Sequence, residues 1–284
     1  MGDRRQATGS IPAVALFGCG RIGSALDEGG SPHVLTHAAA CQLHPELRLA
    51  ALCDPDPDRL AAAGAARGVT ALYADAETLL AREAVDIAVV ATPTAHRTPL
   101  IDAALAAGVR TFVLEKPLAT SLAEAEALAE TLRAAGALVS VNYLRRHAPG
   151  LQSVAERLRA GELGAIQYAN VHYGKGFNNN GSHGVDLMRW WVGEPVSVTV
   201  GGVVDDDRSD DPTLHVSCRV QTPGGVVPVT FHGSDHRAVS LFEVDVVCAR
   251  GRVRMTDRGA TVTVGQVVPD PTFPGYTALK DTEP

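Results

Sequence analysis

The first half of the chain alternates short apolar runs with alanine-rich stretches, and this alternation limits the possible folds more than any other feature. The apolar runs are Ala13–Phe17, Leu47–Cys53, Ile87–Ala91, Thr111–Leu114 and Leu138–Val141. Short runs of Val, Leu and Ala with little polar alternation are typical of strands buried on both faces. Because helical stretches separate them, the order predicts a doubly wound Rossmann-type α/β domain with a parallel sheet.

From about Gly150 the pattern changes to segments with a period of two. Leu214, Val216 and Cys218 alternate with polar neighbours, for example, and turn residues separate the segments at hairpin distances. After a helix near Leu151–Ala160, the expected strands are Ala165–Tyr173, Val196–Val204, Thr213–Thr222, Val226–Ser234, Ser240–Cys248, Gly251–Asp257 and Ala260–Val267. We therefore expect a mostly antiparallel, open-faced sheet, and two domains over residues 11–145 and 146–284.

Composition excludes several classes of protein. The 284 residues are 45% hydrophobic, enough for two packed domains, and a net charge of −7 argues against a broad nucleic-acid-binding face. No apolar run approaches membrane-spanning length. The first ten residues lack a secretory signal, so we expect a loose arm and a cytoplasmic protein. Five cysteines without a CxxC pair predict reduced, mostly buried thiols, and the acidic residues 205–211 predict a solvated loop.

A glycine loop, Gly18–Cys19–Gly20–Arg21–Ile22–Gly23, follows the first expected strand and precedes a helical stretch. In this context the first glycine permits a tight turn, the second lets the backbone approach a pyrophosphate, and the third allows close helix–strand packing. The amides at a helix N-terminus also bind phosphate. We therefore expect a dinucleotide to contact Gly18, Gly20, Arg21, Ile22 and Gly23.

Asp54 ends the second expected strand. A carboxylate there accepts hydrogen bonds from a ribose and repels a 2′-phosphate, which favours NAD over NADP. The alternative is a turn former within Asp54–Pro55–Asp56–Pro57. The interval from the glycine loop exceeds the usual value of about 20 residues, because extra residues around 27–37 must break or shorten the first helix. This insertion either brings His33 or His37 to the substrate pocket or is a solvated surface loop.

Two further strand ends carry polar residues. Thr92 and Pro93 follow the third long run at the edge where ligands bind in such sheets, and His96 either lines the dinucleotide site or starts a helix. Glu115–Lys116–Pro117 follows the next strand. An exposed lysine, with a pKa of about 10.4, is a poor base, so Lys116 needs burial or a nearby imidazolium to act as one. Otherwise it donates a hydrogen bond to a substrate oxygen.

The segment Gly181–Asp186 predicts a helix start in the second domain, with Ser182 as the N-cap of a helix through Trp191. An imidazole at such a position is a reasonable acid–base group, so His183 is either catalytic or part of a structural cap network. Asp186 shares a helix face with His183. Lys175, Asn178 and Asn180 flank this segment and suit recognition of hydroxyl groups. His172 and Tyr173 either lie on the sheet face nearby or, as we expect, pack in the core.

Together, the glycine loop, Ala91–Thr92–Pro93 with His96, EKPLA at Glu115–Ala119 and GSHxxDLMRW from Gly181 resemble the Gfo/Idh/MocA family of oxidoreductases. The resemblance extends from about Ile11 to Val267. It implies a Rossmann domain, an open-faced sheet domain, and oxidation or reduction of a sugar or cyclitol carbinol with NAD or NADP. It also implies that Lys116 and His183 lie beside the nicotinamide and the substrate, with Glu115 near the nicotinamide ribose. Arg145 and Arg146 resemble the family's arginine pair at the domain junction.

The sequence departs from the family pattern at Asn179, where many members have an aspartate, and asparagine cannot carry a proton. The chain also ends sooner after Val267 than typical members do, so we expect an open substrate pocket or one completed by a partner subunit. We expect no metal, and substrate contacts from Arg146, Lys175 and Asn179. The exposed sheet face is expected to form a homodimer or homotetramer.

The predicted function is an NAD(P)-dependent dehydrogenase or reductase that acts on a secondary alcohol or ketone of a sugar, nucleotide sugar or cyclitol. Lys116 and His183 are its expected catalytic residues. The alternatives are a non-catalytic sensor of NAD and sugars, a glycosidase that retains NAD, and an imine reductase.

Overall fold

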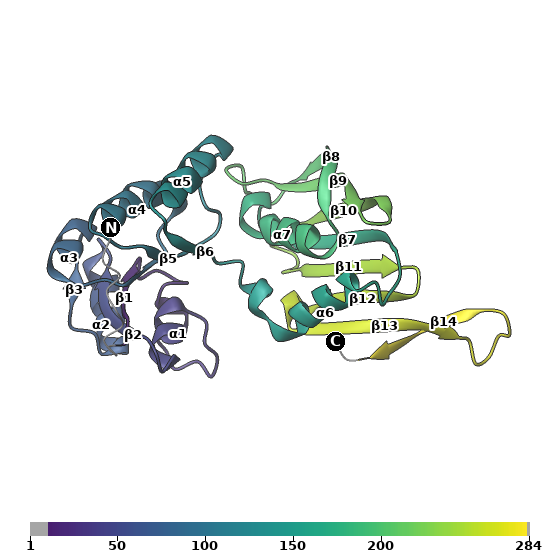
Figure 1. The fold of residues 1–284 in the computed structure, drawn as a ribbon, viewed down its shortest axis with the longest axis horizontal. Helices are drawn as coiled ribbons and strands as arrows, with labels where there is room; N and C mark the ends of the chain where they lie inside the picture. The colour runs from purple at the N-terminus through teal and green to yellow at the C-terminus, as the bar shows by residue number, and fades with distance from the viewer. Residues whose placement is uncertain (1–10, 283–284) are drawn as a thin grey trace. The chain divides into compact units, whose positions relative to one another are not determined.

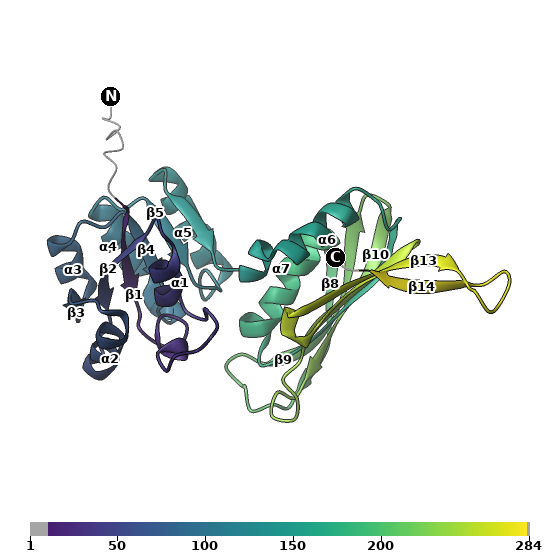
Figure 2. The same ribbon diagram turned by 90° about the horizontal axis from the view of Figure 1, so that it is seen from below.

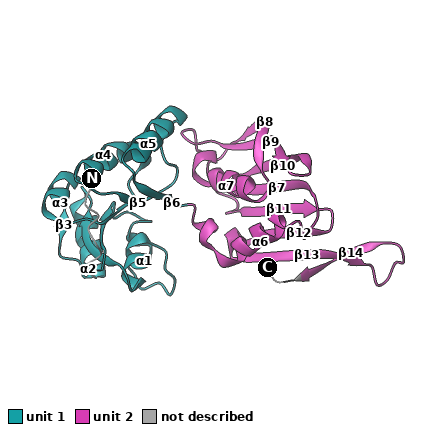
Figure 3. Cartoon of the chain, viewed as in Figure 1, with its two compact units in different colours: residues 1–142 teal, residues 143–284 magenta. Residues whose placement is uncertain are grey.

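The computed structural model describes residues 11–282 and divides into two compact units, one ending at Asn142 and one beginning at Tyr143 (Figure 3). The predicted N-terminal arm, residues 1–10, lies outside the described residues. Each unit has its own sheet and its own hydrophobic core. Within residues 11–282, none of the helices has the length and apolar character needed to cross a membrane.

The first unit contains the predicted parallel sheet, with strand order β3-β2-β1-β4-β5-β6 (Figure 1). Its strands are β1 (Ala13–Phe17), β2 (Arg48–Cys53), β3 (Leu72–Tyr73), β4 (Ile87–Val90), β5 (Thr111–Leu114) and β6 (Leu138–Val141). All five predicted strands are present. The sequence did not indicate β3, because two residues are too few to form a pattern. The order reverses between β1 and β4, which is the point where such sheets bind ligands at their carboxyl ends.

Helices cover both faces of this sheet, as Figures 1 and 2 show. They are α1 (His37–Leu43), α2 (Pro57–Arg67), α3 (Ala76–Arg82), α4 (Arg97–Ala106) and α5 (Leu122–Ala134). Residues of α1 and α2 share one core cluster, and residues of α3, α4 and α5 share another. Local sequence fixes the helix ends. Asp56, for example, accepts hydrogen bonds from the amides of Asp58 and Arg59, and Gly68 ends α2 with a φ of 66°.

The insertion does interrupt the first helix, as predicted. The amide of His37 donates to the carbonyl oxygen of Ile22, and that of Ala38 donates to Gly23. In an uninterrupted helix the donor and the acceptor of such a bond are four residues apart, whereas here they are fifteen residues apart. Eleven extra residues are therefore looped out, and without them Asp54 would follow the glycine loop at the usual interval of about 20 residues.

A buried carboxylate holds the insertion in place. Asp27 accepts hydrogen bonds from the amides of Leu35 and Thr36 and from the Thr36 hydroxyl, and it forms an ion pair with Arg67. Burial by itself raises the pKa of Asp27, but these hydrogen bonds and the Arg67 charge hold it below its usual value. The insertion is thus a fixed part of the fold, and His33 is exposed on it.

The second unit is an eight-stranded mixed sheet with two helices, α6 (Pro149–Arg159) and α7 (Ser182–Trp191), on one face. Its strand order is β14-β13-β12-β11-β7-β10-β9-β8. The strands are β7 (Ile166–Gly174), β8 (Glu194–Val204), β9 (Thr213–Thr222), β10 (Gly225–Ser234), β11 (Phe242–Cys248), β12 (Gly251–Thr256), β13 (Thr261–Pro269) and β14 (Thr277–Thr282). Only β10 and β7 pair in parallel, so the prediction of a mostly antiparallel sheet is confirmed. Strand β14 was not predicted from the sequence.

The face of this sheet without helices carries a row of histidines. His172 stacks on His232 with ring centroids 4.9 Å apart, and neither side chain is fully buried. The prediction that His172 lies in the core is therefore wrong, because strand alternation directs it outward while its neighbour Tyr173 is fully buried. All five cysteines are buried free thiols, as predicted, and burial raises the pKa of Cys19 to about 12.

Candidate active site

The glycine loop follows β1 and leaves room for a dinucleotide at one of its three glycines. A Cβ atom on Gly18 would lie 2.8 Å from the carbonyl group of Ala91, and one on Gly23 would lie 2.0 Å from the carbonyl oxygen of Gly18. A Cβ on Gly20 would meet only the Arg59 guanidinium, at 4.0 Å. The first and third glycines are therefore required by packing, while the second leaves an open approach to the backbone that fits a pyrophosphate.

Asp54 lies at the end of β2, as predicted, and its carboxylate accepts hydrogen bonds from the protein backbone. One oxygen accepts the amide of Cys19 at 2.7 Å, the other accepts the amide of Asp56 at 3.0 Å, and the side chain is 2% exposed. Arg59 approaches it to 3.7 Å. The bond to Asp56 is the turn-forming role that the sequence leaves open as an alternative. The bond to Cys19 shows that the carboxylate also holds the glycine loop. Each oxygen keeps a lone pair that a ribose hydroxyl can use.

The loop after β4 places Thr92 partly buried and Pro93 and His96 exposed. His96 precedes α4 without a side-chain cap, so its predicted contact with the dinucleotide stays a prediction. The Thr92 hydroxyl oxygen is shielded from solvent and has no hydrogen-bond partner within the described residues. An orphaned buried hydroxyl at this edge of the sheet fits a missing polar ligand.

Arg97, which was not predicted from the sequence, connects this loop to the loop after β5. The side chain is almost fully buried, and its guanidinium donates to the carbonyl oxygens of Thr92, Pro117 and Leu118. Burial lowers the pKa of Arg97, although the charges of Glu115 and Glu124 oppose this effect. Arg97 therefore ties the end of β4 to the loop that carries Lys116. No sequence signal indicates this, because an arginine early in a helix is usually solvated.

Glu115 follows β5 and gathers polar groups from three parts of the first unit. Its carboxylate bonds His37 Nε2 at 2.8 Å and Asn142 Nδ2 at 2.7 Å, and it accepts the amide of Lys116 at 3.3 Å. Burial raises the pKa of Glu115, but His37, Asn142 and the Lys116 charge together hold it below its ordinary value. The insertion thus places His37 against Glu115, whereas His33 is exposed on its surface. Lys116 itself is partly buried.

In the second unit, His183 lies in the first turn of α7 and is 8% exposed. Its ring contacts Tyr143 and Phe242 edge-on, with centroid distances of 5.6 and 6.1 Å. The prediction that Ser182 caps this helix is wrong. A π-helical turn, Phe177–Gly181, runs directly into α7, so Ser182 has helical dihedral angles and Gly181 takes the cap position.

An acidic loop holds that π-helical turn, so the prediction of a solvated loop is wrong for two of its residues. Asp211 is 8% exposed, and its carboxylate accepts the amides of Asn178 and Asn179. Asp206 is 2% exposed and accepts the hydroxyl of Thr213, which in turn accepts the amide of Gly176. Sequence alone could not distinguish these carboxylates from their solvated neighbours, because the amides that Asp211 accepts lie 32 and 33 residues away and no pattern marks Thr213 as the partner of Asp206.

The predicted substrate contacts differ in their surroundings. Lys175 is exposed and has a φ of 70°, while the Asn179 side chain donates to the Lys175 carbonyl oxygen. Arg146 is already engaged, since its Nε lies 2.9 Å from both oxygens of Asp186 and its guanidinium stacks on Trp190. Burial raises the pKa of Asp186, and Arg146 opposes this effect. Arg146 is therefore an anchor for α7 rather than an obvious ligand contact.

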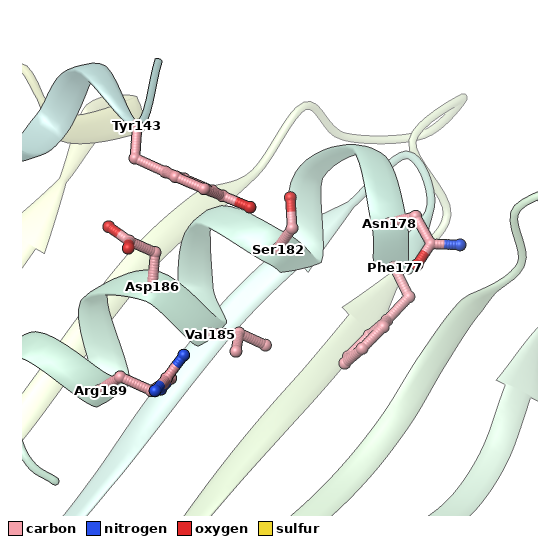
Figure 4. A pocket seen from close by; sticks show the side chains of 7 residues that line it. All are labelled: Tyr143, Phe177, Asn178, Ser182, Val185, Asp186 and Arg189. Carbon is pink, nitrogen blue, oxygen red and sulfur yellow. The ribbon is translucent and has the colours of Figure 1, made fainter. Parts of the chain in front are cut away.

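A pocket in the second unit runs along the polar side of α7 (Figure 4). Tyr143 lies over the helix with its hydroxyl directed toward Ser182, to which it is hydrogen-bonded. The complete lining is Tyr143, Phe177, Asn178, Ser182, Val185, Asp186 and Arg189. Hydroxyl, amide, carboxylate and guanidinium groups beside apolar surface suit a polyhydroxylated ligand. Asn178, which the sequence suggests for recognition of hydroxyl groups, lines this pocket, whereas Arg146, Lys175 and Asn179 do not.

The described residues contain no group of three His, Cys, Asp or Glu side chains that could hold a metal ion. A dinucleotide would be held by the glycine loop, Asp54 and the loop after β4.

Comparison with known proteins is consistent with this geometry. Residues 13–143 match the model of an oxidoreductase family with an NAD-binding Rossmann fold. A D-apiose dehydrogenase from Paraburkholderia graminis is 35% identical over 130 residues, which are 46% of this chain and 34% of that protein. A myo-inositol dehydrogenase from Streptomyces leeuwenhoekii is 29% identical over 66% of this chain and 58% of its own length. The matched stretch spans between about a third and a half of the first curated relatives.

Solved structures share the fold of both units. An oxidoreductase from Sinorhizobium meliloti has a TM-score of 0.76 at 17% identity and covers 96% of this chain and 77% of its own. The WlbA dehydrogenase from Bordetella pertussis, solved with NADH and UDP-GlcNAcA, has a TM-score of 0.74 at 24% identity over 88% of this chain and 79% of its own. At these identities the likeness establishes the fold alone.

Proposed function

Through residues 13–143 the chain belongs to the Gfo/Idh/MocA oxidoreductases, which bind NAD on a Rossmann fold, and we propose that it is an NAD-dependent dehydrogenase or reductase. The proposed substrate is a secondary alcohol or ketone of a sugar, nucleotide sugar or cyclitol. The observation that carries the proposal is the shared sheet edge of the first unit. There, an open glycine loop, an orphaned Thr92 hydroxyl and the Glu115–Lys116 loop follow three parallel strands.

In this mechanism Lys116 and His183 act on one substrate oxygen. NAD, when bound, supplies a hydride acceptor, and NADH supplies the donor. During alcohol oxidation His183 takes the hydroxyl proton, and Lys116 stabilises the negative charge that develops on the oxygen. Reduction reverses the proton transfer, so the same imidazole then acts as the acid. Glu115 fixes the backbone of Lys116 through its amide, and Arg97 fixes the following residues through their carbonyl oxygens.

Substrate hydroxyl groups are proposed to bind along α7. Tyr143, Ser182 and Asn178 offer donors and acceptors in the pocket, whereas Asn179 contributes at most an amide. Names of relatives support this substrate class, because they include dehydrogenases of D-apiose and of inositols and a 3-reductase of a dTDP-sugar. Lys175 and Arg146 remain proposed secondary contacts.

NAD is proposed over NADP because Asp54 keeps a carboxylate at the ribose position. Arg59, which could otherwise accommodate a 2′-phosphate, is engaged by Asp54 and Asp56. The helix-free face of the second sheet is proposed to pair with another copy of the chain, since exposed strands of this length are usually covered.

The test is cofactor oxidation and reduction, followed by absorbance at 340 nm, across a panel of sugars, cyclitols and nucleotide sugars. Wild-type protein is compared with Lys116→Ala and His183→Ala, and each variant is checked for NADH binding and thermal stability. We expect turnover by the wild type and a loss of about 10²-fold to 10⁴-fold in each variant. Full turnover in both variants would contradict the proposed mechanism.

A second candidate, a non-catalytic sensor of NAD and sugars, is favoured by Asn179, which stands where many relatives have a proton carrier. Tight NADH binding without turnover of any panel member would support the sensor. Release of free sugar from a glycoside with no net change in NADH would instead support a glycosidase. Turnover confined to imines would identify an imine reductase.

A further inference from the structure

Two adjacent arginines of the second unit differ in their partners. Arg146 forms its ion pair with Asp186, but no aspartate or glutamate of the described residues pairs with Arg145. The Arg145 Nε atom is shielded from solvent and has no hydrogen-bond partner in that part of the chain. Burial alone lowers the pKa of Arg145 to about 10, with no neighbouring charge contributing. Because a half-buried cation without a counter-charge is costly, the retention of Arg145 calls for an explanation outside the folded chain.

The surroundings hold this guanidinium in one position. Its carbon lies 4.1 Å from the ring centroid of Phe242, and Nη2 donates to the carbonyl oxygen of Arg258 at 3.0 Å, on the solvent-accessible side. Asp257 and Arg258 have φ angles of 48° and 58°, and Gly259 has a φ of 101°. A Cβ on Gly259 would lie 3.3 Å from Arg145 Nε. A strained turn thus accommodates the arginine while leaving its outer end accessible.

Arg145 is also close to the proposed catalytic histidine. Phe242 contacts both groups, with its ring centroid 4.1 Å from the Arg145 guanidinium carbon and 6.1 Å from the His183 ring centroid. The guanidinium and the imidazole are therefore at most about 10 Å apart. An upper bound of about 10 Å is compatible with one sugar ring that carries an exocyclic charged group.

We infer that Arg145 binds the carboxylate of a sugar acid whose reacting hydroxyl lies at His183. A planar guanidinium whose outer end is accessible to solvent matches a carboxylate, and a ligand anion supplies the counter-charge that no described carboxylate supplies. The short distance to His183 favours a charge on the reacting sugar over the diphosphate of a nucleotide. This inference deepens the proposed function by assigning the class of substrate.

The experiment compares binding of D-glucuronate with D-glucose, D-galacturonate with D-galactose, and UDP-glucose, measured by calorimetry with and without NADH. Arg145→Met keeps the stacking on Phe242 and removes the charge, Arg145→Lys keeps the charge, and Arg159→Met removes an exposed charge of the same unit. We expect the wild type to prefer at least one acid over its neutral partner by about tenfold to a hundredfold. That preference should vanish in Arg145→Met, partly return in Arg145→Lys and persist in Arg159→Met.

Thermal melting separates this role from a structural one. A ligand-binding arginine predicts that unliganded Arg145→Met melts at the same temperature as the wild type or higher, since a half-buried charge without a counter-charge is lost. A lower melting temperature together with an unchanged acid preference would overturn the inference. So would the absence of any acid preference in the wild type, or an effect confined to UDP-glucose. Acid binding through Arg145 without redox turnover would leave the inference standing and contradict the proposed enzyme.

Discussion

The two halves of the proposed site are built in different ways. In the first unit, Gly18, Asp54, Thr92 and Glu115 each follow a strand of one parallel sheet, so the topology alone brings them to one edge. In the second unit, the π-helical turn that leads to His183 depends on Asp211, whose hydrogen-bond partners lie 32 and 33 residues away. The comparison shows that strand ends can be found from sequence pattern, whereas a site supported by distant side chains cannot.

The largest effect on stability is expected in the glycine loop. Gly23→Ala places a Cβ against the Gly18 carbonyl oxygen and should lower the free energy of unfolding by about 3 kcal/mol. Gly20→Ala has open space and should change that free energy by less than about 0.5 kcal/mol. It should nevertheless weaken NADH binding by about tenfold or more, because the methyl group occupies the approach to the backbone.

Urea unfolding and fluorescence titration with NADH measure the two effects separately. Equal stability of the two variants would show that the loop is not held by the packing described. Unchanged NADH binding by Gly20→Ala would place the pyrophosphate elsewhere.

Asp211→Ala tests whether the second half depends on its distant carboxylate. Two amides of the π-helical turn lose their acceptor, which should lower the free energy of unfolding by about 2 kcal/mol and reduce kcat more than NADH affinity. Asp210→Ala is the matched control, because that side chain is exposed. If both variants behaved alike, the acidic loop would be the solvated segment that the sequence predicts. Urea unfolding and steady-state kinetics supply the measurements.

A smaller effect is expected from the Glu115 cluster. Asn142→Leu removes one of the hydrogen bonds that hold the Glu115 pKa down, so it should cost about 1 kcal/mol at pH 7. A lowered carboxyl pKa stabilises the fold above the unfolded value of about 4.3, and this contribution is lost as pH falls through the folded pKa. Asn142→Leu should therefore begin its acid unfolding at a higher pH than the wild type.

Unfolding midpoints between pH 3 and pH 7 provide this comparison, with Gln167→Leu as an exposed amide control. Parallel stability curves for Asn142→Leu and the wild type would show that Asn142 does not act through Glu115.

Much of the fold followed from the sequence because buried parallel strands and alternating antiparallel strands have different periods. The exceptions are instructive. Strand β3 has two residues, the π-helical turn has no recognised signal, and His172 was assigned to the core although alternation turns it outward. In the candidate site, motif residues could be predicted by their place after strands, but Arg97 could not, because its partners are backbone carbonyl oxygens. The sequence indicates Arg145 and Arg146 as a pair, and only the structure shows that Arg146 is the one paired with Asp186.

The central claim is that Lys116 and His183 act on the same oxygen, and a double-mutant cycle tests it most directly. Single-turnover rates are measured for Lys116→Met, His183→Asn and the double variant with the best substrate of the panel. We predict that each single variant loses about 10³-fold and that the double variant loses little more, because groups that act as a unit are not additive. Losses that multiply to about 10⁶-fold would mean that the two residues act independently and would contradict the mechanism.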